Sequence, residues 1–222
     1  MKFRNLAFIA SIVSLLVVPS PTFAQAKDKS LATHNEAATA LKQDMRKLWT
    51  DHVVWTRDYI VAATLNQPDA PAALNRLMKN QDDIGNAMAK FYGAAAGRQL
   101  TTLLKDHIAI AGDIVKAAMG GDKAGQKAAD DKWHQNAIQI SDFLSKANPN
   151  WPRATLLEMM NTHLSTTAAE LGARLSKDWE GDVKAFDAVY DHILHMADAL
   201  SDGIIKQFPE KFGGGVASTT GR

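Results

Sequence analysis

Three histidines that recur at nearly constant spacing are the residues in this chain best suited to chemistry. His52, His107 and His163 each end a short motif, and the three motifs lie about 55 residues apart. Apolar residues stand at the same offsets around all three, seven positions before, one after and eight after. A repeat of this length predicts one supersecondary unit used three times, here a helical hairpin.

A second polar position follows each histidine by 28 or 29 residues and is filled by Asn80, Asn136 and His192. Asp83 stands one helical turn after Asn80. If the three hairpins close around a common axis, the histidines and these second positions form one buried polar layer. Hairpins stacked in a row would separate them. Because a buried imidazole or amide is costly without a hydrogen bond, such a layer needs mutual partners or a ligand.

Metal binding is the function that this layer suggests first. The richest ligand set is expected in the third hairpin, where His163, Glu170, His192 and His195 come within reach if the helices pair in register. Two imidazoles one turn apart, together with a carboxylate, suit zinc (Zn), iron (Fe) or copper (Cu). The other geometry uses the three repeated histidines. The chain has no cysteine, so every metal ligand has to be nitrogen or oxygen.

Other interpretations of the layer stay open. Its side chains can bond to one another and fix the register of the hairpins, as a buried asparagine does in coiled coils. The protein would then be a non-catalytic structural or cell-envelope interaction protein. An enzyme on a small organic substrate would instead use the layer for acid and base chemistry. Trp49, Trp55 and Trp133 could line a ligand pocket, although aromatic residues at helical spacing more often fill a core.

Six helices have to position these residues. Apolar residues three or four positions apart predict helices over 38–66, 72–92, 98–119, 123–147, 153–179 and 183–208. Proline or glycine breaks the pattern between them. No stretch alternates β-branched residues between turns, as a strand would. The sequence therefore predicts an all-α fold: a six-helix bundle of three hairpins (38–92, 98–147 and 153–208) in one domain, 38–209.

The two ends of the chain are expected to lie outside this bundle. Residues 1–24 show a basic start, an apolar run and a small-residue cleavage pattern, which together are typical of a signal peptide cut after Ala24. Residues 25–37 are predicted to be a flexible segment and residues 210–222 a disordered tail. We therefore expect a periplasmic or secreted protein without a transmembrane segment. Nearly balanced charges favour a metal or small-molecule ligand over nucleic acid as the partner.

Four motifs carry a resemblance to a known family. They are LWTDHVVWTR at 48–57, NQDDIGN at 80–86, NPNWP at 148–152 and ADALSDGI at 197–204. Over nearly all of its mature length the chain resembles a family of small exported bacterial all-helical proteins, which often carry the automatic label "glycosyltransferase" and have no established mechanism. The resemblance implies an exported helical protein and supplies no active-site residues. Sugar-nucleotide transferases resemble doubly wound α/β domains, and this sequence offers no strands to build one.

Overall fold

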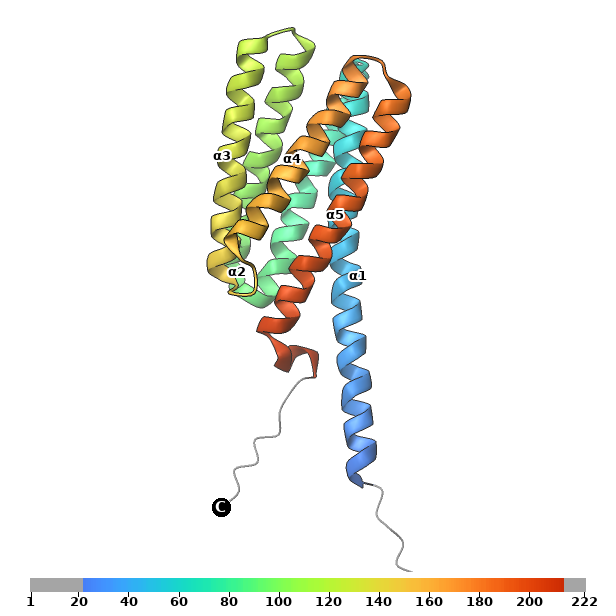
Figure 1. The fold of residues 1–222 in the computed structure, drawn as a ribbon, viewed down its shortest axis with the longest axis vertical. Coiled ribbons are helices and arrows are strands. Elements are labelled where there is room, and N and C mark those ends of the chain that lie inside the picture. Colours follow the sequence, from blue (N-terminus) through green and yellow to red (C-terminus); the bar gives the residue numbers. More distant parts are fainter. Residues whose placement is uncertain (1–21, 214–222) are drawn as a thin grey trace, which may run out of the picture.

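The chain folds into a bundle of long helices. The computed structural model describes residues 22–213. The elements in chain order are α1 (Thr22–Thr64), α2 (Ala70–Met119), α3 (Lys123–Ala147), α4 (Arg153–Leu175), α5 (Trp179–Gln207) and the 3-10 helix η1 (Pro209–Phe212). No strand occurs in this part of the chain, so the prediction of an all-α fold is confirmed. Figure 1 shows the helices aligned along one long axis.

Residues 22–213 form five α-helices where six were predicted, because α2 runs through the expected break between 92 and 98. Within α2, Gly93 has φ 84° and ψ 162°, a conformation that glycine adopts without the strain that a side chain adds. Figure 1 shows the two parts of α2 turning back on one another at the lower end of the bundle. They approach so closely that a Cβ on Gly97 would lie 2.6 Å from the backbone oxygen of Gly85. A glycine at 97 is therefore needed for this contact.

Aspartates begin two of the helices. The carboxylates of Asp122 and Asp178 accept hydrogen bonds of 2.9 Å from the backbone amides of Gly125 and Gly181, in the first turns of α3 and α5. Such caps satisfy amides that the first turn leaves without helical partners. With Asp178 as its cap, α5 starts at Trp179, and the predicted turn at 180–182 is instead the first turn of the helix.

The N-terminal part of α1 differs from the prediction. The helix includes residues 25–37, which the sequence pattern assigns to a flexible segment. This stretch contains no proline or glycine and is rich in alanine and other good helix formers, so nothing in it stops the helix. Figure 1 shows this end of α1 projecting beyond the other helices. Of the predicted signal peptide (residues 1–24), residues 1–21 lie outside the described part of the chain.

The C-terminal end also carries more structure than predicted. Residues 209–212 form η1, and Phe212 is buried with its ring stacked on Phe91 at 6.0 Å between centroids. The predicted tail beyond residue 213 lies outside the described residues. Between residues 22 and 213, none of the helices has both the length and the hydropathy needed to cross a membrane.

Candidate functional site

Four imidazole rings converge in the middle of the bundle. His52 of α1, His107 of α2 and His163 of α4 are buried, and His192 of α5 is partly buried. The ring centroid of His163 lies 5.6 Å from that of His52, 5.9 Å from that of His107 and 6.4 Å from that of His192. The structure therefore brings together the histidines that the repeat spacing selects, with His163 at their centre.

Each of the three second positions donates a hydrogen bond to a backbone carbonyl on the helix of its repeat histidine. The acceptor is always the residue four positions before that histidine. The bonds join Asn80 Nδ2 to Leu48 O (2.9 Å), Asn136 Nδ2 to Leu103 O (3.0 Å) and His192 Nε2 to Met159 O (2.9 Å). In an α-helix the same carbonyl also accepts the histidine's own backbone N–H. The three bonds hold three helix pairs in equivalent register.

The side-chain partners decide which ring nitrogens stay unpaired. Because Asn136 turns its Nδ2 to a carbonyl, its Oδ1 accepts the Nδ1 proton of His107 at 2.8 Å. Nε2 of His107 is then buried without a partner. Gln81, which the sequence pattern does not single out, donates from Nε2 to His52 Nδ1 at 3.4 Å. Nδ1 of His163 is also fully buried and has no hydrogen-bond partner.

Burial keeps these imidazoles uncharged near neutral pH. Loss of solvation, with a smaller contribution from His107, lowers the pKa of His52 to about 3. Loss of solvation likewise lowers the pKa of His107 to about 4. The pKa of His163 falls well below its ordinary value because of burial first and the surrounding imidazoles second. Neutral imidazoles suit both a metal site and a hydrogen-bonded core.

The space inside the layer is small. A cavity of about 20 Å³ lies among His52, His107 and His163, closed by apolar side chains such as Leu104 and Met160. This volume accommodates one water molecule or one ion, and it excludes an organic ligand.

Three of the predicted site residues lie away from the layer. Glu170 is buried on α4 and accepts a hydrogen bond from Arg57 Nη1 at 2.8 Å. His195 is exposed on α5, and Asp83 pairs with Lys79 at the surface of α2. Within residues 22–213 no group of three or more His, Asp or Glu side chains is arranged to hold a metal ion. The expected ligand set of the third hairpin is therefore not brought together.

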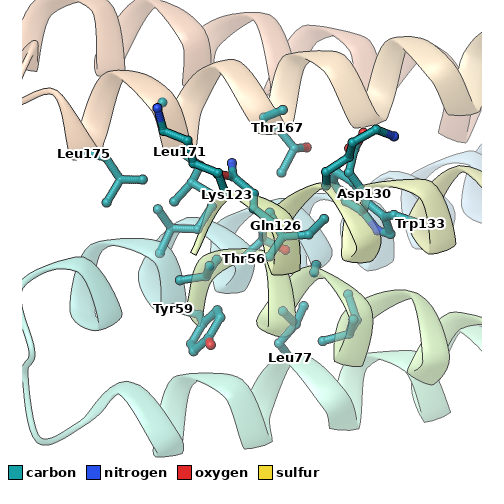
Figure 2. Close-up of a pocket in the computed structure, with 18 residues that line it drawn as sticks. Thr56, Tyr59, Leu77, Lys123, Gln126, Asp130, Trp133, Thr167, Leu171 and Leu175 are labelled. Atoms are coloured by element: carbon teal, nitrogen blue, oxygen red, sulfur yellow. The ribbon is translucent and has the colours of Figure 1, made fainter. Parts of the chain in front are cut away.

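An apolar pocket of about 430 Å³ adjoins the layer, enclosed by α1, α2, α3 and α4 (Figure 2). Thr56, Ala111 and Thr167 line it and follow the three repeat histidines by four residues, so the pocket begins one helical turn beyond the layer. Trp133 also lines the pocket, while its ring lies 5.1 Å from that of His107. The volume falls within the range of small-molecule pockets.

A few polar groups stand in this apolar lining. Oγ1 of Thr167 is buried without a hydrogen-bond partner, and only 6% of the residue is exposed. Nε1 of Trp133 is a second buried donor without a partner. Figure 2 shows Thr167 directed from α4 toward α3, with Tyr59 on the far wall. Lys123, at the start of α3, lines the pocket and has no ion pair within the described chain.

No protein-family model, curated protein or solved structure matches this chain.

Glu170 belongs to a group of charged side chains that the sequence pattern misses. Arg57 contacts Glu170 and both carboxylate oxygens of Asp182 at 3.0 Å, and Arg174 contacts Asp182 at 3.2 Å. We call these four residues the ion cluster. Burial raises the pKa of Glu170 to about 7, against the opposing effect of Arg57. In the sequence Asp182 resembles an ordinary acidic helix start, and only the packing of α5 against α1 and α4 buries it.

One residue that lines the pocket was predicted from the sequence. Trp133 was a candidate for lining a ligand pocket, and it does line one, whereas Trp49 lies beside the His52 ring in the buried core. Apolar periodicity does not separate these two roles, because both side chains lie on inward stripes.

Proposed function

We propose that this chain is a helical-bundle protein that binds a small, largely apolar organic molecule in the pocket beside the histidine layer. The observation that carries the proposal is the Thr167 hydroxyl, buried without a partner in the wall of a 430 Å³ pocket. Leaving such a group unsatisfied costs roughly 1–3 kcal/mol. An acceptor on a bound ligand removes this cost. Mostly apolar pockets with a few convergent polar groups are the usual form of small-molecule sites.

In this proposal the histidine layer has a structural role and closes the pocket at one end. The equivalent bonds of Asn80, Asn136 and His192 support a bundle of three repeated hairpins, with α2 contributing one helix to each of the first two. A buried polar layer of this kind fixes register, as it does in coiled coils. None of the four histidines lines the pocket, which favours binding over acid–base catalysis.

Gly172 provides the test, because it lines the pocket and a Cβ added there meets no atom within 4 Å. Gly172 is exposed at the edge of the pocket, so the ring of Gly172→Phe obstructs the pocket from its rim. The helix tolerates this change because glycine is the poorest helix former after proline. We expect this variant to keep its melting temperature and to lose binding of the neutral apolar dye N-phenylnaphthylamine. Gly172→Ala is the matched control, since it raises helix propensity and leaves most of the pocket empty. Equal dye binding by all three proteins would contradict the proposal.

A metal ion in the layer is the second candidate. The unpaired Nε2 of His107 and Nδ1 of His163 beside a 20 Å³ cavity favour it. They supply two of the ligands that zinc takes, and a rotation of the neighbouring His52 ring supplies a third. We expect about one equivalent of zinc, copper or iron by mass spectrometry in the purified protein, and its loss in His163→Asn. Metal contents below about a tenth of an equivalent, without thermal stabilisation by added ions, would remove this candidate.

Export completes the proposal. Cleavage after Ala24 would leave a periplasmic or secreted protein that begins within the first turn of α1. Mass spectrometry of the intact protein recovered from the cell envelope or medium tests this, and retention of residues 1–24 would contradict it.

A further inference from the structure

We infer that the ligand is an oxygenated fatty acid, held with its carboxylate at Lys123 and with a hydroxyl or keto oxygen of its chain at Thr167. The inference rests on the proposed function and names the ligand class for the same pocket. Three features of the pocket lead to it: its length, one unpaired cation at its mouth and one unpaired hydroxyl in its wall.

The pocket is elongated. Lys123 and Trp133 both line it and stand ten residues apart on α3, which corresponds to about 15 Å along the helix. On the α4 wall Thr167 and Leu175 both line it and stand eight residues apart, about 12 Å. An apolar space of this length suits an extended chain better than a compact ring system.

The mouth of the pocket favours an anionic head group. Lys127 is held by Asp131 at 2.7 Å and also lies in the field of Asp130, so its charge is compensated. Lys123 is exposed and forms no ion pair among residues 22–213. A carboxylate can pair with Lys123 at the rim while it keeps part of its hydration, which avoids the cost of burying a charge.

The wall of the pocket favours an oxygen in the ligand chain. A plain alkyl chain offers the Thr167 hydroxyl no acceptor. Rotation about the Cα–Cβ bond of Thr167 turns its covered hydroxyl toward the pocket, where a hydroxyl or keto oxygen of the ligand accepts its hydrogen bond. The rest of the chain can pack against apolar side chains such as Leu171 and Ile108. The buried Nε1 of Trp133 is a second donor for the same oxygen or for one further along the chain.

Calorimetric titration with matched probes tests the inference. The probes are dodecanoate, a series of oxododecanoates with the keto oxygen at successive carbons, and neutral dodecanol. We expect at least one oxododecanoate to bind more tightly than dodecanoate. Lys123→Gln should weaken binding of the acids about threefold and leave dodecanol unchanged. Thr167→Val, nearly identical in shape, should weaken the preferred oxododecanoate about fivefold and leave dodecanoate unchanged.

Lys132→Gln is the matched control, because Lys132 is an exposed lysine of the same helix that does not line the pocket. It should leave every affinity unchanged. Equal affinities for dodecanol and the acids, or equal affinities in the wild type and both pocket variants, overturn the inference and leave the proposed function standing. If neither the acids nor dodecanol nor the neutral dye binds, the proposed function falls together with the inference.

Discussion

Acid should destabilise this protein by protonating its histidine layer. The variant His107→Gln measures how much one imidazole contributes to this loss of unfolding free energy. An unfolded histidine has a pKa of about 6.5, whereas burial lowers that of His52 to about 3 and that of His107 to about 4. Between pH 7 and pH 5 the unfolded state therefore binds protons that the folded state does not bind. Each of these two histidines lowers the free energy of unfolding by about 2 kcal/mol over that interval. His163, also shifted down, acts in the same direction.

Glu170 acts in the opposite direction. Its folded pKa of about 7 exceeds the ordinary value of 4.5, so the folded state takes up this proton before the unfolded state does. Over the same interval this raises the free energy of unfolding by about 2 kcal/mol. Three histidines outweigh one glutamate, so the free energy of unfolding falls as the pH falls. The loss is a large part of the roughly 5–15 kcal/mol that stabilises a domain.

Urea unfolding followed by circular dichroism, repeated from pH 7.5 to pH 5, measures this slope. His107→Gln should reduce the slope near pH 5 by about one proton, or about 1.4 kcal/mol per pH unit. A uniform loss of stability in the variant does not affect the comparison, because only slopes are compared. Asn161→Gln changes an exposed residue of α4 that does not titrate, so it is the control and should keep the wild-type slope. The reasoning fails if His107→Gln also keeps the wild-type slope, or if the wild type gains stability in acid.

Three further predictions concern packing. Asn136→Leu removes the bond to the Leu103 carbonyl and the acceptor of His107, and should lower the free energy of unfolding by about 2–3 kcal/mol in urea titrations. Gly203→Ala would place a Cβ 1.8 Å from Nε1 of Trp151, so calorimetry should show a lower melting temperature and a loss of about 1–3 kcal/mol; an unchanged melting temperature would contradict the packing. Arg57→Met removes the arginine partner of Glu170 and leaves Asp182 paired with Arg174 alone, and it should cost about 2–3 kcal/mol in urea titrations at neutral pH.

The repeat in the sequence predicted the convergence of the histidines for a physical reason. Equivalent positions in repeated units lie at the same height along the bundle axis when the units pack side by side. His52, His107 and His163 therefore lie at one height if the hairpins pack around a common axis. The same reasoning selected Asn80 and Asn136, whose bonds to backbone carbonyls are equivalent in the structure. The pattern did not select the direct partners of the rings, since that choice depends on side-chain torsions.

Glu170 shows where periodicity misleads. It lies seven residues after His163 and on the same helical face, but two turns separate the two residues by about 10 Å along the axis. The His163 side chain therefore lies in the layer, whereas the Glu170 side chain reaches the ion cluster.

The apolar pattern did not predict the pocket for a related reason. Periodicity counts apolar residues without regard to size, and the space arises where the small residues Ala111, Ala168 and Gly172 line the pocket.

Trp133 has a different neighbour on each side, the His107 imidazole toward the layer and the pocket beyond the layer. The emission of an indole depends on the polarity around it and is quenched by a charged imidazole close to the ring. Binding of a ligand in the pocket and protonation of His107 would therefore both change the fluorescence of Trp133. The fluorescence of Trp133 therefore reports both ligand binding in the pocket and protonation in the layer.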